Sequence, residues 1–188
     1  MGTNHMGRQS IRFPQPPVVR GFASVAGKKE REGPLGDQFT ATVQDTTFGE
    51  KSWERAERRM QQMTLELALE KAGLTDADLD AAFAGDLLNQ CIGSSFSLRN
   101  RGVPTLGLYG ACSTMAESLL LAAMSVSGGY ARTALAMTSS HFASSERQYR
   151  FPLGYGGQRT PTSQWTVTGA GAVLLGSGEH GIRITAAT

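Results

Sequence analysis

Hydrophobic positions recur at helical spacing through one long segment of the chain. Between residues 53 and 72 apolar side chains return every three or four positions. Ser52 precedes this segment as a typical N-cap, and Gly73 follows it as a typical stop. The pattern predicts an amphipathic helix with its apolar stripe in the core. The stripe consists of Trp53, Ala56, Met60, Met63, Leu67 and Ala68.

Further along, short uninterrupted apolar runs alternate with helical patterns. The runs at 81–87, 104–109 and 132–138 are typical of strands that are buried on both faces. The segments 89–100 and 112–127 between them favour helices. This strand–helix alternation predicts a parallel sheet covered on both sides. Because segment 112–127 carries few charges and many small side chains, we expect it to be buried between layers.

The two ends of the chain show weaker patterns. Residues 1–12 are polar and lack an apolar centre, so we interpret them as a tag or a disordered leader and place the domain at 13–188. A short strand is expected near 18–25 and a capped helical turn at 75–78.

The C-terminal third begins with a long segment, 140–165, that has little periodicity. A connection of this length within a domain is usually a functional or interface loop. The runs 166–175 and 182–187 predict two neighbouring antiparallel strands joined by a turn at 176–181. Gly169-Ala170-Gly171 lies inside the first of them and lacks the spacing of a dinucleotide loop, so we assign it to close packing.

Composition narrows the class of protein. The 188 residues are 40% hydrophobic, which suits one domain with a sizeable core, and a net charge of +2 gives no reason to expect nucleic acid as a partner. The densest basic cluster, at Arg55, Arg58 and Arg59, is interleaved with Glu54 and Glu57, which predicts a solvated helix face.

Membrane and cysteine signals are also weak. The longest apolar stretch, Leu119 to Ala123, is too short to cross a bilayer, so we expect no transmembrane segment and at most peripheral association. With no apolar leader we expect no signal peptide. The two cysteines, Cys91 and Cys112, form no disulfide framework and match no metal motif, which favours a reduced, intracellular setting without a metal site.

The sharpest chemical signal surrounds Cys112. A predicted strand ends, the small residues Gly110 and Ala111 follow, and a predicted helix begins at or near the cysteine. A thiol in this position faces the unpaired N–H groups of the helix start, which stabilise a thiolate, as in a nucleophile elbow. The alternative is a small, buried and unreactive cysteine packed at a tight turn.

A second group of polar residues, Thr138-Ser139-Ser140-His141, follows the C-terminal end of another predicted strand. Ligands of open parallel sheets bind outside these strand ends. We therefore expect Ser139, Ser140 and His141 to face one cleft together with Cys112. The alternative for His141 is a structural hydrogen-bonding group.

Two further places carry charged candidates. Arg147 and Arg150 could clamp a carboxylate, and the alternative is an ion pair with Glu146 or with a partner subunit. Asp86 lies at a strand-to-helix junction beside two amide side chains, and we expect it to cap or turn the chain first and to line a pocket second.

Taken together, these motifs resemble the stage V sporulation protein AD family of the thiolase superfamily, which occurs in spore-forming Firmicutes. The resemblance covers nearly everything from about residue 12 onward. The matching segments are Lys29 to Gly36, Trp53 to Arg58, Ala84 to Gln90, Gly110 to Thr114, Thr138 to His141, Glu146 to Gln148, Tyr155 to Gln158 and Thr166 to Gly169.

The resemblance implies an α/β fold with five αβαβα layers, made of two similar halves and usually dimeric. This chain would be the N-terminal half, with a mixed, mostly parallel sheet. In thiolases and ketoacyl synthases the first half supplies the cysteine, and the second half supplies the His and Asn or second Cys that assist it. We therefore expect Cys112 to keep the nucleophile position without its partners, and we lean away from an enzyme.

The family's implied role is to bind dipicolinic acid and to support its uptake into the forespore and its release in germination. The expected setting is the cytoplasm or forespore, at the inner spore membrane beside other stage V sporulation membrane proteins. Dipicolinate is a flat dianion, with or without calcium, and no other cofactor is expected. Helix N-termini, hydroxyls and guanidiniums suit it. The ligand-binding candidates are Ser113, Thr114, Ser139, Ser140 and His141, then Asp86, Arg147 and Arg150.

Two other functions stay open. In the first, the chain belongs to an acyl-thioester condensing enzyme in which a coenzyme A or carrier-protein substrate acylates Cys112. In the second, the fold serves only as a non-catalytic docking subunit of a membrane transport complex.

Overall fold

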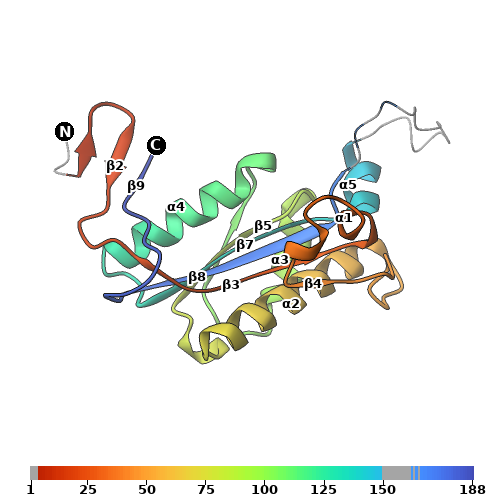
Figure 1. The fold of residues 1–188 in the computed structure, drawn as a ribbon, viewed down its shortest axis with the longest axis horizontal. Coiled ribbons are helices and arrows are strands. Elements are labelled where there is room, and N and C mark those ends of the chain that lie inside the picture. Colours follow the sequence, from red (N-terminus) through yellow and green to blue (C-terminus); the bar gives the residue numbers. More distant parts are fainter. Residues whose placement is uncertain (1–3, 150–161, 163, 165) are drawn as a thin grey trace.

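A mixed sheet of six strands, formed by the described residues, runs through the centre of the molecule (Figure 1). The computed structural model describes residues 4–149, 162, 164 and 166–188. The strands of this sheet are β3 (Val18–Ala26), β4 (Ala41–Thr42), β5 (Ala81–Gly85), β6 (Thr105–Leu108), β7 (Thr133–Ser140) and β8 (Gly169–Gly176). Their order is β4-β3-β8-β7-β5-β6.

The strand directions confirm a mixed, mostly parallel sheet. The pairs β3–β4, β5–β6 and β5–β7 are parallel, whereas β8 is antiparallel to both of its neighbours. The cysteine turn and the end of β7 therefore lie at the same edge of the sheet, because parallel strands end on the same side.

Helices cover the two faces of this sheet. The long helix α2 (Trp53–Ala72) and α3 (Ile92–Leu98) lie on one face, and α4 (Thr114–Ser127) lies on the other (Figure 1). Side chains of β7 alternate between them. Leu135 and Met137 join the core under α2, whereas Ala134 and Ala136 join the core under α4. Two smaller helices, α1 (Lys28–Arg31) and α5 (Phe142–Tyr149), follow β3 and β7 respectively.

The ends of α2 have the chemistry that the sequence predicts. The Ser52 side chain accepts a hydrogen bond from the Arg55 N–H at 3.3 Å, and Gly73 ends the helix in the left-handed conformation with φ of 64°. Ala56, Met60 and Ala68 of the apolar stripe are fully buried.

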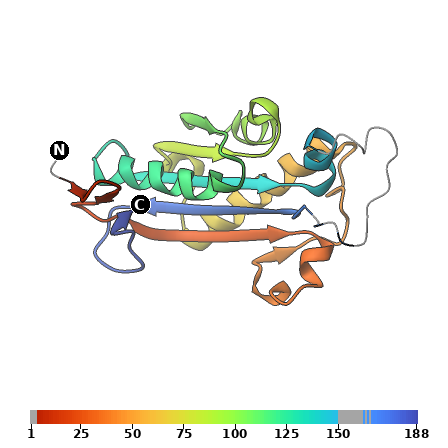
Figure 2. The same cartoon turned by 90° about the horizontal axis from the view of Figure 1, so that it is seen from above.

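One face of the sheet is covered only in part. From above, α4 lies along β5 and β7, and β8 and β3 lie beside it without a helix over them (Figure 2). Because no helix covers this part of the face, Phe22 of β3 is 55% exposed. The predicted burial of segment 112–127 between layers is therefore found on one side only: Ala122 and Ala123 are fully buried, and Met124 is exposed.

The C-terminal strands differ from the prediction. Instead of pairing with residues 182–187, β8 lies between β3 and β7. Its uninterrupted apolar run is best buried between two strands, whereas polar residues such as Arg183 and Thr185 interrupt the last segment. The antiparallel hairpin predicted from the sequence is therefore wrong.

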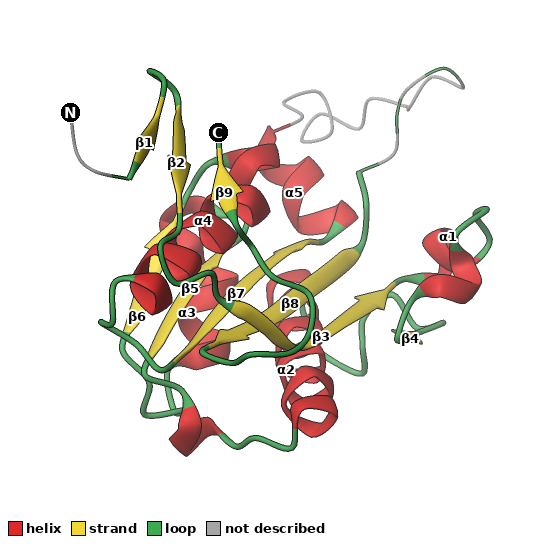
Figure 3. Cartoon of the chain, turned by 60° about the vertical axis from the view of Figure 1, so that its left-hand side comes forward, coloured by secondary structure: helices red, strands yellow, loops and turns green. Residues whose placement is uncertain are grey.

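A second, smaller sheet joins the two ends of the described chain (Figure 3). In it β9 (Ala186–Ala187) pairs antiparallel with β2 (Ser10–Arg12), and β2 pairs with β1 (His5–Met6). Residues 5–12 thus contribute two short strands, and our interpretation of 1–12 as a tag or leader stays a prediction.

Two helices differ from their predicted bounds. The segment predicted as one helix over 89–100 starts with a 3₁₀ turn (Asn89–Cys91) before α3. Gln90 and Cys91 both have positive φ there, 61° and 50°. Helix α5 lies inside the segment in which we saw little periodicity. Its buried face consists of Ser144, Ser145 and Glu146, so a hydrophobic pattern could not indicate it.

Candidate functional site

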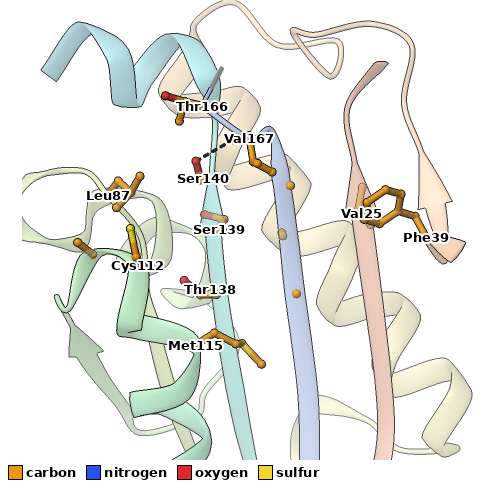
Figure 4. Close-up of a pocket in the computed structure, with 14 residues that line it drawn as sticks. Val25, Phe39, Leu87, Cys112, Met115, Thr138, Ser139, Ser140, Thr166 and Val167 are labelled. Carbon is orange, nitrogen blue, oxygen red and sulfur yellow. Dashed lines mark hydrogen bonds between the residues drawn. The ribbon is translucent and has the colours of Figure 1, made fainter. Parts of the chain in front are cut away.

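A cleft opens at the carboxyl end of β7, beside the start of α4 (Figure 4). It has a volume of about 500 Å³. Cys112 and Met115 lie on one side of it and Val25 and Phe39 on the other, with β7 and β8 between them. The ends of these strands therefore form one site with the cysteine turn, at the place where open sheets bind ligands.

A tight turn presents Cys112 to the cleft. Ala111 has a positive φ of 49°, and the 3₁₀ turn Ala111–Ser113 leads into α4. Thr114 Oγ1 donates to the Ala111 carbonyl at 2.9 Å and accepts from the Gly110 N–H at 3.1 Å. Ser113 Oγ donates to the Gly110 carbonyl at 2.7 Å. The hydroxyls of Ser113 and Thr114, expected in the pocket, therefore stabilise the turn and do not line the cleft.

The two cysteines differ in solvent exposure. Cys112 is exposed and lines the cleft, so the alternative of a buried and unreactive cysteine does not describe it. It does describe Cys91, whose Sγ donates to the Leu108 carbonyl at 3.1 Å and whose pKa is raised by burial.

The end of β7 sends its side chains to two different faces. Thr138 and Ser140 lie on the cleft side, and Ser140 Oγ donates to the Val167 carbonyl at 2.7 Å (Figure 4). Ser139 also borders the cleft, but its hydroxyl donates to Glu57 of α2, behind the sheet. Strand alternation thus places only part of the predicted hydroxyl group in the cleft.

Glycines of β8 form the floor of the cleft. Gly169 pairs with Ser140 and Gly171 pairs with Thr138. A Cβ atom added to Gly171 would meet nothing within 4 Å, and one added to Gly169 would make only ordinary contacts at 3.5 Å. Our assignment of this segment to close packing is wrong for Gly171, because the missing side chain opens space.

His141 is buried outside the cleft lining. Its Nδ1 accepts from the Ala143 N–H at 3.2 Å, so its Nε2 donates to the Thr46 carbonyl at 2.8 Å as a neutral imidazole. Burial lowers the pKa of His141, although the Thr46 hydrogen bond raises it in part. Its ring packs 5.4 Å from Trp53 and 5.1 Å from Phe142. His141 therefore has the alternative role, that of a structural hydrogen-bonding group, and it does not lie in the cleft with Cys112.

Asp86 shapes the rim of the cleft. Its carboxylate accepts the Leu88 N–H at 2.9 Å, the Ser94 N–H at 2.8 Å and the Ser94 hydroxyl at 2.7 Å. These bonds cap α3 and fix the loop that carries Leu87, a lining residue. Asp86 thus has the capping role that we expected first, and it does not itself line the cleft.

Of the two candidate arginines, Arg147 lies in the described structure and does not line the cleft. Arg147 forms an ion pair with Glu54 of α2, and Arg150 lies outside the described residues. Among the residues that the structure describes, the cleft lining contains no charged side chain. The described cleft is therefore mainly apolar, with a few hydroxyls and one thiol.

Sequence reasoning missed a buried carboxylate behind this cleft. Glu57 of α2, predicted on a solvated face, is fully buried. Its oxygens accept the hydroxyls of Ser139 at 2.8 Å and Ser144 at 2.7 Å. Burial raises the pKa of Glu57 to about 7 against these two hydrogen bonds, and the charges of Asp86 and Glu54 raise it further.

The polar network continues from Glu57 across α2. Gln61 Nε2 donates to Ser139 Oγ at 2.7 Å and to Ser94 Oγ at 3.1 Å, and Ser94 donates in turn to Asp86. A chain of hydrogen bonds therefore joins the two buried carboxylates. The sequence contains one signal for this network. Glu57, Gln61 and Thr64 recur at helical spacing beside the apolar stripe.

Two features are absent from the residues that the structure describes, a cluster of metal ligands and a membrane-spanning helix. The part of the chain that the structure describes contains no group of three or more His, Cys, Asp or Glu side chains able to hold a metal ion. None of its helices is both long and apolar enough to cross a membrane.

The mixed sheet, its helical layers and the cysteine turn define a thiolase-like fold. Solved structures with this fold include 3-oxoacyl-[acyl-carrier-protein] synthase III from Aquifex aeolicus VF5, with a TM-score of 0.57 and 18% identity over 87% of this chain and 55% of that one. OleA from Xanthomonas campestris gives a TM-score of 0.58 and 16% identity, over 88% of this chain and 57% of that one. At these identities the likeness concerns the fold alone.

Closer relatives identify the family. The chain belongs to the stage V sporulation protein AD family, which matches residues 7–188. Stage V sporulation protein AD from Bacillus subtilis (strain 168) is 44% identical over 182 residues, which cover 97% of this chain and 54% of that protein. The chain thus spans about half the length of this relative.

Proposed function

We propose that this chain supplies the Cys112 cleft of a sporulation protein that binds dipicolinic acid and supports its uptake into the forespore and its release in germination. The observation that carries the proposal is the bare glycine floor of the cleft, in a chain of this family. The protein would act as a homodimer at the inner spore membrane, beside other stage V sporulation membrane proteins.

The shape of the cleft suits a small flat ring. Without side chains at Gly169 and Gly171, an aromatic ring can lie against the strand backbone, where larger residues would exclude it. Thr138 supplies a hydroxyl at one edge of this floor, and Ser140 can supply another when its proton turns from the Val167 carbonyl to the ligand. Met115 and Val167 add apolar walls.

The negative charge of the ligand needs a positive group to neutralise it. A dianion in an apolar cleft requires neutralisation, and the described lining offers no cation. We infer that calcium bound with the dipicolinate, or cationic side chains from beyond the described residues, completes the site. If calcium supplies this charge, the affinity should depend on calcium, whereas cationic side chains should bind dipicolinate without added calcium.

One observation favours a second function. An exposed thiol at a strand-to-helix turn beside an apolar cleft also suits acyl transfer, in which the Cys112 thiolate attacks a thioester carbonyl and the thiol of the donor leaves. We place this function second because the described lining contains no general acid or base, and His141 is buried elsewhere.

Calorimetric titration tests the first function. Dipicolinate, with and without calcium, should give saturable heat with the wild-type protein and weaker binding with Thr138→Val and Ser140→Ala. Ser113→Ala serves as the control, because its hydroxyl belongs to the turn and not to the cleft. Absence of saturable heat from folded protein under both conditions would refute the proposal. A mass shift on Cys112 with acyl thioesters would instead support the second function.

A further inference from the structure

Glu57 occupies an unusual position behind the cleft. It is fully buried on α2, and in the described part of the chain it forms no ion pair. Its two partners are hydroxyls from two other elements, Ser139 of β7 and Ser144 of α5. Burying a carboxylate without a cation costs free energy, and such carboxylates are concentrated at functional sites.

The hydrogen bonds around Glu57 can accommodate one proton without leaving a group unpaired. Ser144 Oγ lies 2.7 Å from Glu57 Oε2 and 3.2 Å from the His141 carbonyl. When Glu57 is ionised, Ser144 donates to it. When Glu57 is protonated at Oε2, it donates to Ser144, and Ser144 turns its hydrogen to the His141 carbonyl. Ser139 donates to Oε1 in both states.

Helix α5 connects this exchange to the rim of the cleft. Gln148 Nε2 donates to the Leu87 carbonyl at 3.1 Å, and Gln148 Oε1 accepts the Asn89 N–H at 3.0 Å. Glu146 accepts the Thr166 N–H at 3.3 Å. Leu87 and Thr166 both line the cleft. One short helix thus holds two segments of the rim, and Glu57 holds the first turn of that helix.

We propose that Glu57 is a positioning residue that couples the rim of the Cys112 cleft to the uptake of one proton. When Glu57 is protonated, it carries no charge in its buried position, so α5 stays packed over it and keeps the rim ordered. When Glu57 is ionised, the buried charge favours hydration, so α5 loosens at its start and both rim segments become more mobile. The site would then bind its ligand more tightly below neutral pH than above it, a statement that rests on the proposed function.

The surroundings of Glu57 support a transition near neutral pH. Asp86 at the end of β5 and Glu54, one turn earlier on α2, are the charges that act on it, and both raise its pKa. On α5, Arg147 is turned to Glu54 and Glu146 to Thr166. Toward Glu57 itself, β7 and α5 present only the two hydroxyls among their described contacts. Burial is the largest cause, and the pKa lies at about 7.

Hydrogen exchange of two amides tests the coupling without any ligand. The Asn89 and Thr166 N–H groups both donate to side chains of α5. After correction for intrinsic exchange, their protection should fall several-fold from about pH 6 to about pH 8 in the wild-type protein. In Glu57→Gln the protection should be high at both values, and Ser144→Ala, which removes a hydrogen bond to the carboxylate, should move the fall to higher pH.

Thr64→Val is the matched control, because Thr64 is buried on the same helix and bonds only to its own backbone at Met60 in the described contacts. It should keep the wild-type pH dependence. Equal protection at both pH values in the wild-type protein, or an unchanged dependence in Glu57→Gln, would overturn the inference. Should the amides respond while dipicolinate binds at neither pH, the coupling stands and the proposed ligand fails.

Discussion

At the scale of single residues, the cleft depends on what is missing from Gly171. Its backbone needs no positive φ, and an added Cβ meets open space, so a larger residue fits the fold and fills the cleft instead. Glycine here therefore serves the volume of the site and not the conformation of the strand.

Gly171→Val should abolish dipicolinate binding while it leaves the free energy of unfolding unchanged, or raises it by up to about 1 kcal/mol, because valine is favoured over glycine in strands. Calorimetry and urea unfolding measure the two effects. Gly178→Val, at an exposed glycine outside the cleft, is the control and should bind normally. Wild-type affinity in Gly171→Val would show that the ligand lies elsewhere.

Glu57 predicts a pH dependence of stability. The pKa of Glu57 in the folded protein, about 7, lies above the usual 4.5. Its contribution to the free energy of unfolding is therefore fully present below pH 4.5 and is lost as the pH rises toward 7. The loss is on the order of 3 kcal/mol at about 1.4 kcal/mol per pKa unit. His141 acts in the opposite direction, because its lowered pKa favours folding at higher pH.

Comparison with Glu57→Gln separates the two groups. Urea unfolding at pH values on either side of this range should show that the variant gains stability relative to the wild type as the pH rises. A constant difference between the two proteins would mean that Glu57 does not titrate there.

The residues that sequence reasoning placed correctly are those whose role follows from their position on the chain. Cys112 reaches the cleft because a strand end and a helix start determine its place. His141 and Glu57 were misplaced because their roles depend on packing between distant segments, Thr46 with His141 and Ser144 with Glu57. The helical spacing of Glu57 could indicate that it is buried, but a single sequence does not indicate which distant segments contact each other.

At the scale of elements, the sequence predicts those features that depend on residues close together along the chain. The caps and stripe of α2 gave its bounds, because Ser52 and Gly73 act within one turn. The position of β8 was not predictable, because antiparallel insertion between β3 and β7 involves partners that lie far away along the chain. Helix α5 was hidden because it buries hydroxyls and a carboxylate instead of apolar side chains.

Asp86 allows an element-scale prediction. Its carboxylate accepts three hydrogen bonds, and an amide in its place would turn one donor toward another donor. Asp86→Asn should therefore lower the free energy of unfolding by about 1–3 kcal/mol, by leaving a buried N–H group at the start of α3 unpaired. Denaturant unfolding measures this cost. Asp37→Asn, at an exposed ion pair with Arg31, should cost less than about 1 kcal/mol.

At the scale of the whole molecule, β6 forms one of the two edges of the described sheet, and the short strand β4 forms the other. The outer side of β6 has no neighbour in the described sheet, and Leu106 is 50% exposed there, with Phe96 of α3 also exposed. Unpaired strand edges bind further strands, so we expect the proposed homodimer to form by pairing of β6 with β6 of a second copy.

Leu106→Lys should convert this dimer to a monomer in sedimentation experiments, because a charged residue blocks such an edge. Tyr130→Lys, at a residue that is 88% exposed just beyond α4, is the matched control and should stay dimeric. A monomeric wild-type protein, or a Leu106→Lys dimer, would contradict this arrangement.

The small sheet of β1, β2 and β9 has a consequence for the longer relatives. It gathers both ends of the described chain at one end of the molecule, and α5 lies at the other (Figure 1). In a longer polypeptide that continues beyond β9, the chain would have to run back along β8, roughly 27 Å for eight extended residues, before it could reach the cleft. On that path it would pass β8 and β3 where no helix covers them (Figure 2).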